Sequence, residues 1–200
     1  MFSDFNAIAD GLATHSYAIA DQFLSQPEVK AITQLEDFQQ SLQRFKKAGI
    51  GKQQHFHINE VTRGDYIRWL DKRSVAPELS VYIRRVEALM GFLNQALFLS
   101  LKDLEIHMTV YPVGTYYKRH LDQFKRDDHR KLSIICYLNE NWEERNGGEL
   151  RMYLPEGVKE ILPLAGRLVC FRSDVLEHEV LPATRERLSL TGWLLDHLVS

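Results

Sequence analysis

The chain has 200 residues, 44% of them hydrophobic, and its 25 basic and 27 acidic residues give a net charge of −2. That is enough chain for one domain with a full hydrophobic core, so we expect residues 1–200 to form a single domain. A balance so close to neutral excludes the strong global field typical of nucleic-acid or membrane-surface binding, and no stretch approaches the roughly 18 apolar residues that span a membrane.

The N-terminus and the cysteines bear on where the protein works. The first residues, MFSDFNAIADGL, lack the cationic start and the apolar core of a signal peptide. Cys136 and Cys170 both lie inside apolar runs, where small buried thiols are expected rather than metal ligands or a disulfide. Both observations favour a cytoplasmic protein.

Residues 1–103 are predicted to be mainly helical. Ser25 and Glu28 form a capping box that begins one amphipathic helix, and the apolar spacing carries this helix to Gly49. A second amphipathic helix begins near Pro77. Between the two helices, residues 51–77 are polar with scattered aromatic side chains, and they predict a long functional loop that acts as a lid.

Near residue 104 the hydrophobic pattern changes to that of strands. Eight short apolar or alternating segments follow, separated by turn residues: EIHMTVYP, TYYKRHLDQ, KLSIICYLN, GELRMYL, KEILPL, GRLVCFRS, HEVLPA and ERLSLTGWLLD. Eight such strands over residues 104–200 predict a sandwich, a jelly roll or a small barrel. Several segments are apolar on both faces, so we expect the helices to cover one sheet.

A candidate metal site begins in the segment TYYKRHLDQF. In a strand, His120 and Asp122 point to the same face about 6 to 7 Å apart along the chain. His178 opens another predicted strand after the acidic turn SDVLE and offers a third ligand. Two histidines and one carboxylate leave adjacent metal positions open, which is the arrangement of non-haem Fe(II) oxygenases.

The other histidines are weaker candidates. His55 and His57 repeat the same spacing, but only Glu60 accompanies them as a further ligand. The remaining histidines have no partner at useful spacing and are expected to be bystanders: His15, His107, His129 and His197.

The last predicted strand carries an arginine of interest. Arg187 shares one face with Ser189 and Thr191, nine residues after His178. An arginine held at that place could bind a carboxylate through two parallel hydrogen bonds.

An ordered series of motifs extends this pattern over about two thirds of the chain. The series consists of RGDYIRWL, VYPVGTYYKRHLD, IICYLNENW, GGELRMY, FRSDVLEHEV and R-x-S-x-TGW. In this order the sequence resembles the iron(II)- and 2-oxoglutarate-dependent dioxygenases, specifically the prolyl 4-hydroxylase-like branch that includes the hypoxia-inducible-factor prolyl hydroxylases and their bacterial relatives. The resemblance implies an α+β fold, in which a double-stranded β-helix of about eight strands carries N-terminal helices on one sheet.

The resemblance also implies roles for individual residues. It makes His120, Asp122 and His178 the Fe(II) ligands and gives the distal carboxylate of 2-oxoglutarate to Arg187. The rest of the co-substrate pocket would consist of Tyr111, Tyr137 and Thr191. Asp65 and Arg130 would pair to link the lid loop to the barrel, and the substrate mouth would contain Trp69, Tyr117 and Trp193.

The implied reaction consumes O2 and 2-oxoglutarate, releases succinate and CO2, and hydroxylates a C–H bond, which we expect to belong to a prolyl residue of a protein. Ascorbate is the expected supporting reductant. Two departures from the animal enzymes, a segment one residue shorter between Tyr111 and His120 and a loop after Trp69 that does not align, leave the substrate open, and the oligomeric state is open as well.

Two alternatives remain at this point. A dioxygenase of the same chemistry acting on nucleic acid is suggested by basic residues around the expected mouth, although acidic residues interleave with them: Lys118, Arg119, Lys125, Arg126, Arg130 and Lys131. A cupin-like sensor that binds a ligand without turnover is the other alternative, and succinate formation separates it from both enzymes.

Overall fold

A computed structural model describes residues 5–49, 62–123 and 128–198. The helices are α1 Phe5–His15, α2 Gln26–Thr33, α3 Glu36–Gln39, α4 Ser41–Arg44 and α5 Pro77–Leu97, with a 3₁₀ turn at Glu144–Asn146. The strands are β1 Tyr17–Ala20, β2 Lys46–Lys47, β3 Tyr66–Trp69, β4 Asp103–Tyr111, β5 Tyr117–His120, β6 Arg130–Tyr137, β7 Leu150–Leu154, β8 Gly157–Ile161, β9 Leu168–Arg172, β10 His178–Val180 and β11 Arg187–Leu195.

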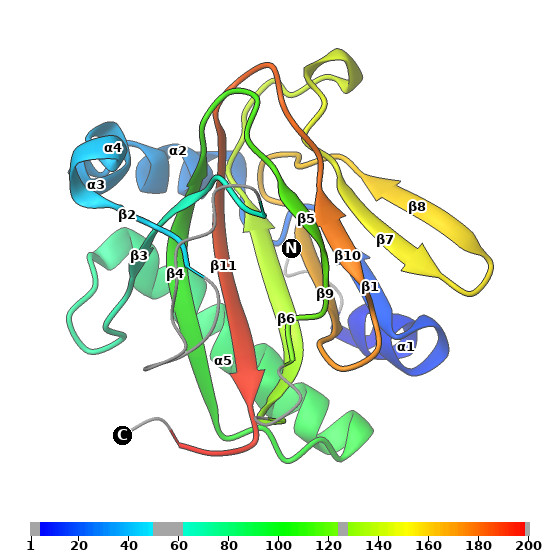
Figure 1. Cartoon of the computed structure of the whole chain (residues 1–200). Coiled ribbons are helices and arrows are strands. Elements are labelled where there is room, and N and C mark those ends of the chain that lie inside the picture. Colours follow the sequence, from blue (N-terminus) through cyan, green and yellow to red (C-terminus); the bar gives the residue numbers. More distant parts are fainter. Residues whose placement is uncertain (1–4, 50–61, 124–127, 199–200) are drawn as a thin grey trace.

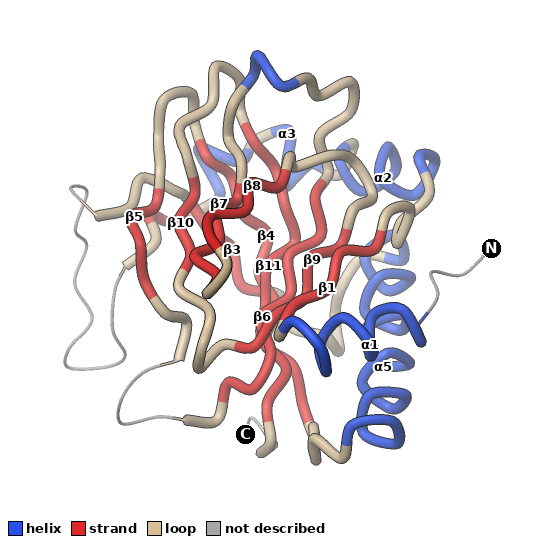
Figure 2. The backbone as a smooth tube through the Cα atoms, turned by 90° about the vertical axis from the view of Figure 1, so that its right-hand side faces the viewer, coloured by secondary structure: helices blue, strands red, loops and turns tan. Residues whose placement is uncertain are grey.

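The strands form two antiparallel sheets. The major sheet has the order β1-β9-β6-β11-β4-β3-β2, and the minor sheet has the order β5-β10-β7-β8. Figures 1 and 2 show the two sheets packed against each other, with α1 and α5 covering the far face of the major sheet. Each of the eight segments predicted after residue 104 is a strand, β4 to β11, and the predicted jelly roll with helices on one sheet is confirmed.

Apolar side chains form two clusters, one on each face of the major sheet. Ile134 and Cys136 of β6 pack with the helices, whereas Ile135 and Tyr137 of the same strand pack between the sheets. Successive residues of a strand point to opposite faces, so β6 needs apolar residues at each position from Ile134 to Tyr137. This double burial explains why the segment reads as continuously hydrophobic.

The helix predicted from Ser25 to Gly49 is wrong beyond its first two turns. It begins as predicted, and the Ser25 N–H donates to the Glu28 carboxylate at 2.7 Å, but the chain then breaks into α2, α3 and α4. The break brings the rings of Phe38 and Phe45 to 5.8 Å from each other. In a straight helix, seven residues would separate the Cα atoms of Phe38 and Phe45 by about 10 Å along the axis. Leu42, which lies between them in the sequence, is 59% exposed. Packing into one core therefore outweighs the local periodicity.

The region before residue 104 also contains strands that were not predicted. β3 pairs with β4 over the register Tyr66↔Val110 to Trp69↔His107, inside the segment predicted to be a lid loop. Tyr66, Ile67 and Trp69 are residue types that favour strands, but the run is short and stands inside a polar stretch, so its pairing with β4 is decided by tertiary contact. Residues 51–61 of the predicted lid lie outside the described residues.

Two further sequence expectations concern the membrane and the thiols. Among the described residues, no helix is both long and apolar enough to cross a membrane. Cys136 and Cys170 are buried free thiols, as predicted, and burial raises the pKa of Cys170 to about 12. The expectation that the chain is a single domain stays a prediction.

Candidate active site

A cavity of about 350 Å³ opens between the two sheets. The major sheet contributes side chains of β3, β4, β6 and β11 to its wall, and the minor sheet contributes those of β5 and β10. All the sequence-predicted site residues except Tyr137 line it, namely Asp65, Trp69, Tyr111, Tyr117, His120, Asp122, Arg130, His178, Arg187, Thr191 and Trp193. The structure thus brings together residues that are up to 128 positions apart.

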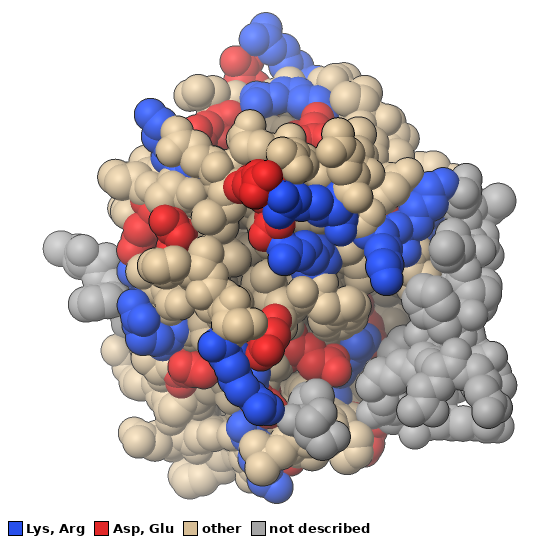
Figure 3. Space-filling view, turned by 90° about the vertical axis from the view of Figure 1, so that its left-hand side faces the viewer, with Lys and Arg blue, Asp and Glu red and all other residues tan. Residues whose placement is uncertain are grey.

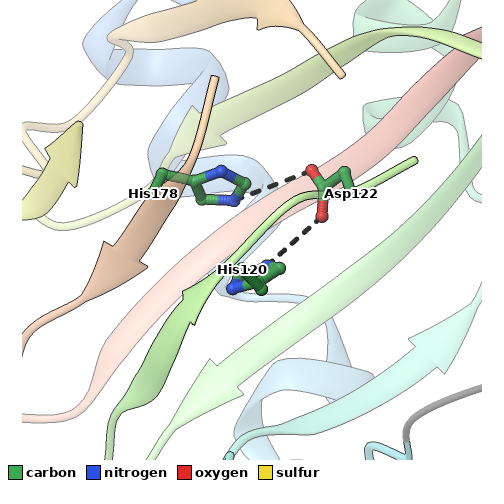
Figure 4. Close-up of side chains that lie close together, drawn as sticks. All are labelled: His120, Asp122 and His178. Atoms are coloured by element: carbon green, nitrogen blue, oxygen red, sulfur yellow. Dashed lines mark ion pairs between the residues drawn. The ribbon is translucent and has the colours of Figure 1, made fainter. Parts of the chain in front are cut away.

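The three candidate metal ligands meet at the wall formed by the minor sheet. His120 at the end of β5 lies directly opposite His178 at the start of β10 in the strand register. His120 Nε2 is 3.4 Å from Asp122 Oδ1, and His178 Nε2 is 3.7 Å from Asp122 Oδ2. Figure 4 shows both rings pointing toward the carboxylate, one toward each oxygen. One ligand atom from each residue lies within 4.8 Å of the others.

Backbone carbonyls determine which nitrogen of each ring faces the cluster. The Lys118 carbonyl accepts from His120 Nδ1 at 2.7 Å, and the Leu176 carbonyl accepts from His178 Nδ1 at 3.2 Å. A carbonyl can only accept, so both Nδ1 atoms carry hydrogen and both Nε2 atoms of the neutral rings present lone pairs. Two lone pairs and a carboxylate then face one point, an arrangement that a cation stabilises.

The protonation states of the cluster suit a cation as well. Burial lowers the pKa of His178 to about 4, so this ring is neutral at physiological pH. Burial alone would raise the pKa of Asp122, but attraction to His178 and His120 and a hydrogen bond from Ser133 outweigh it and hold this pKa well below its usual range. Ser133 Oγ donates to Asp122 Oδ2 at 2.6 Å and lies 2.8 Å from Ser173 Oγ. The carboxylate is therefore ionised and oriented.

Arg187 lines the same cavity from β11 and lacks a counter-ion among the described residues. It is 1% exposed, and its Nε and Nη2 atoms have no hydrogen-bond partner in the described part of the chain. The buried Tyr137 hydroxyl is likewise unpartnered there. The guanidinium carbon lies 5.0 Å from the Tyr111 ring centroid and 4.9 Å from that of Tyr137. A buried cation with free donors beside a free hydroxyl fits a bound carboxylate.

The mouth of the cavity is aromatic, and His107 belongs to it. The ring of His107 lies 4.9 Å from Trp69 and 5.6 Å from Trp193, and its Nδ1 is 2.8 Å from Thr109 Oγ1. His107 is in neither candidate metal cluster of the described residues. Its contacts come from neighbouring strands and from two positions along its own, and the sequence did not reveal them. Burial lowers the pKa of His107 to about 4, so the ring is neutral. Arg130 stacks 3.4 Å from the Trp193 ring centroid.

Asp65 and Arg130 each have an ion-pair partner that was not predicted. Asp65 is 1% exposed and binds Arg63 through both oxygens, at 2.7 and 2.6 Å. Arg130 Nη2 lies 3.2 Å from Glu105 Oε2. A direct link between Asp65 and Arg130 stays a prediction.

Sequence reasoning missed several residues of the site. Ser133 lies two and four positions before Ile135 and Tyr137, so the alternation of a strand could have placed it on the cavity face. Thr109 and His107 could have been found in the same way from Tyr111. Arg63 opens the motif RGDYIRWL, but no role was predicted for it. His55, His57, Lys125 and Arg126 lie outside the described residues.

Comparison with known proteins places this site in a family. The sequence model of the 2OG-Fe(II) oxygenase superfamily matches residues 106–195. A hypoxia-inducible factor prolyl hydroxylase of Caenorhabditis elegans is 29% identical over 195 residues, which cover 90% of this chain and 26% of that protein. Prolyl hydroxylase EGLN3 of Homo sapiens is 31% identical over 159 residues, 75% of this chain and 63% of that protein. The chain thus spans less than two thirds of the length of these curated relatives.

Solved structures agree over nearly the whole chain. A crystal structure of a Pseudomonas putida prolyl-4-hydroxylase has a TM-score of 0.87 and 40% identity, and the match covers 97% of this chain and 100% of that chain. A Trichoplax adhaerens prolyl hydroxylase in complex with a hypoxia-inducible factor peptide fragment has a TM-score of 0.84 and 29% identity, covering 96% of this chain and 89% of that chain. With the fold, the cavity and these matches in agreement, the chain belongs to the 2OG-Fe(II) oxygenase superfamily.

Proposed function

We propose that this chain is an Fe(II)- and 2-oxoglutarate-dependent dioxygenase that hydroxylates a prolyl residue of a protein or peptide. The observation that carries the proposal is a single cavity with two complementary ends. One end has two imidazole lone pairs and an ionised carboxylate around one point, and the other has a buried arginine without a counter-ion among the described residues. A metal ion and a dicarboxylate satisfy both ends at once.

At the metal end, His120, Asp122 and His178 would hold Fe(II). Three protein ligands leave positions open for O2 and for the 2-oxo acid end of 2-oxoglutarate. When bound, iron with these two molecules supplies the oxidant: one oxygen atom of O2 enters the C–H bond, the other enters succinate, and CO2 leaves. The chain itself contributes the orientation of the ligands through the Lys118 and Leu176 carbonyls.

At the other end, Arg187 and Tyr137 would bind the distal carboxylate of 2-oxoglutarate. Their unpartnered buried donors gain charge-assisted hydrogen bonds from it, which are about twice as strong as bonds between neutral groups. Tyr111 packs against the guanidinium, and Thr191, whose hydroxyl lies 3.1 Å from that of Ser189, contributes a polar group to the same wall.

The mouth favours a peptide over a nucleic acid. Trp69 and Trp193 offer apolar ring surface suited to a pyrrolidine ring, and Tyr117, Asp65 and Arg130 line the same cavity. Two relatives of similar structure are prolyl hydroxylases, and one of them was solved with a peptide. These similarities support the choice of a prolyl substrate in a protein.

Charge around the mouth gives no support to the nucleic-acid alternative. Of the four predicted basic residues that are described, three have acidic partners: Arg119 pairs with Glu177, Arg130 with Glu105, and Lys131 with Asp196. In Figure 3, basic and acidic side chains are interspersed over the face that it shows, whereas a phosphate backbone would favour a continuous basic stripe.

Succinate formation tests the proposal. Purified chain with Fe(II), 2-oxoglutarate and ascorbate under air should form succinate faster when a lysate of the source cells is added, and a proline of a lysate protein should gain the mass of one oxygen. The His178→Ala variant should lose this turnover, whereas His129→Ala, which removes a half-exposed histidine outside the cavity, should keep it.

Other outcomes would point to the alternatives. Binding of metal and 2-oxoglutarate without succinate would indicate the cupin-like sensor, and oxidation of DNA or RNA but of no protein would indicate the nucleic-acid enzyme. The ascorbate requirement, the cytoplasmic location and the assignment of residues 1–200 to one domain stay predictions.

A further inference from the structure

The metal-ligand strand β5 is held from both sides. On one side it pairs with β10 through His120↔His178 and Val180↔Tyr117. On the other side the Lys118 N–H donates to the Thr62 carbonyl at 2.9 Å, and the Gly64 N–H donates to the Tyr116 carbonyl at 2.9 Å. Residues 62–64 therefore attach to the edge of β5 that would otherwise be open, immediately beside a candidate iron ligand.

Side chains continue this attachment up to the imidazole. The guanidinium of Arg63 lies 4.2 Å from the Tyr117 ring centroid. The Tyr117 ring in turn lies 3.6 Å from the His120 ring, nearly parallel at 18°. The other neighbour of the His120 ring is His178, at 4.3 Å and tilted by 55°. His120 thus lies between His178 and a stack that Tyr117 and Arg63 form together.

The outer member of this stack is itself fixed. Asp65, which is 1% exposed, accepts from Arg63 Nε and Nη2, and the Gly49 carbonyl accepts from Arg63 Nη1 at 3.1 Å. The planar guanidinium consequently has one orientation over the Tyr117 ring, because arginine can bind a carboxylate through two donors and contact an aromatic face at the same time. A lysine at this position could pair with Asp65 but could not present a flat cation to the ring.

Rotation of the His120 ring about its Cβ–Cγ bond is opposed by the hydrogen bond from Nδ1 to the Lys118 carbonyl. Stacking on Tyr117 opposes this rotation, because a rotated ring would lose its parallel contact. We propose that Arg63 and Tyr117 are positioning residues that hold the His120 imidazole with Nε2 toward Asp122. The inference rests on the proposed metal site, and it deepens that proposal by assigning an orienting role to residues that do not ligate the metal.

The test measures metal affinity without turnover. The full chain is titrated with Mn(II) in the absence of O2 and 2-oxoglutarate, and free Mn(II) is followed by electron paramagnetic resonance. Tyr117→Phe retains the ring and should bind Mn(II) as the wild type does. Tyr117→Leu removes the ring and should weaken binding about 10- to 100-fold, the usual effect of losing an orienting partner of a ligand.

A matched control exists on the same sheet. Tyr153 on β7 also carries a stacked arginine, Arg119 at 3.8 Å, but it lies on the solvent-facing side. Tyr153→Leu should therefore leave the Kd for Mn(II) unchanged. Arg63→Lys keeps a charge beside Asp65, so it protects the fold, and it should weaken Mn(II) binding by less than Tyr117→Leu does.

Each outcome is decisive. An unchanged Kd in both Tyr117→Leu and Arg63→Lys would overturn the inference, as would an equal loss in Tyr117→Phe and Tyr117→Leu, since the hydroxyl would then matter and not the stacked ring. If Tyr117→Leu does not fold, the comparison of Arg63→Lys with the wild type decides. Failure of the wild type to bind Mn(II) would overturn the proposed metal site itself, which is a separate result.

Discussion

Replacing Arg187 by methionine should make the ligand-free protein more stable. The guanidinium is 1% exposed and its Nε and Nη2 donors have no partner among the described residues. Methionine fills similar space without a charge or unmet donors. Without a bound anion, the wild type bears the free-energy cost of a buried charge that has no partner, and Arg187→Met does not.

The magnitude follows from opposing contributions. A buried charge without a partner costs several kcal/mol, and each unmet buried donor about 1 to 3 kcal/mol. Loss of the stacking on Tyr111 and Tyr137 offsets part of this gain, at about 0.5 to 2 kcal/mol per ring. We expect a net stabilisation of about 2 kcal/mol, which raises the Tm by about 4 to 8 °C for a chain of this size.

Thermal unfolding with and without ligand provides the assay. With Mn(II) present, 2-oxoglutarate at about 100 times its Kd should stabilise the wild type by about 2.7 kcal/mol, and it should not stabilise Arg187→Met. Arg187→Lys, which keeps the charge but not the fork of donors, should gain no ligand-free stability. A ligand-free Arg187→Met protein that is less stable than the wild type, or one still stabilised by 2-oxoglutarate, would refute the reasoning.

Three further predictions follow from single contacts. Ser133→Ala removes the 2.6 Å hydrogen bond to Asp122 and should weaken Mn(II) binding about 10-fold, measured by electron paramagnetic resonance, and unchanged affinity would contradict the role of this hydroxyl. The pKa of His107 is about 4 in the folded protein, below its ordinary value of 6.5. Between these two pH values the unfolded chain binds a proton at His107 that the folded protein does not, so the free energy of unfolding falls as the pH drops from 6.5 to 4. Between pH 7 and pH 5 this contribution is about 2 kcal/mol, and urea unfolding of His107→Asn should lack it. Gly166 has a φ of +79°, and a Cβ there would collide with the Leu24 carbonyl. Gly166→Ala should therefore lower the free energy of unfolding by about 3 kcal/mol, whereas a change below about 1 kcal/mol would show that the turn can relax.

The candidate ligands illustrate how far local patterns reach. His120 and Asp122 are two residues apart, and the two-residue period of a strand is enough to place them on one face. The position of His178 opposite His120 depends on the register between β5 and β10, which the spacing alone leaves open and which the family resemblance anticipated. The structure supports that expectation with distances and with the orienting carbonyls of Lys118 and Leu176.

The failures have a common cause in contacts between distant segments. The helix predicted to reach Gly49 is broken because Phe38 and Phe45 pack in one core. Tyr66–Trp69, inside the predicted loop, becomes a strand because β4 offers it a partner. His107 looked isolated because its aromatic neighbours come from β3 and β11.

The sequence by itself determined the eight strands of the jelly roll, the helix that begins at Pro77 and the residue types for a metal and a carboxylate. These depend on periodicity and spacing within short segments, which the chain carries locally. Only the tertiary structure decided that Arg187 is buried without a counter-ion among the described residues, that Asp65 binds Arg63, and that Tyr117 stacks on His120. Burial, ion-pair partners and ring orientation depend on which strands lie side by side, and strand register is set by the packing of the whole fold.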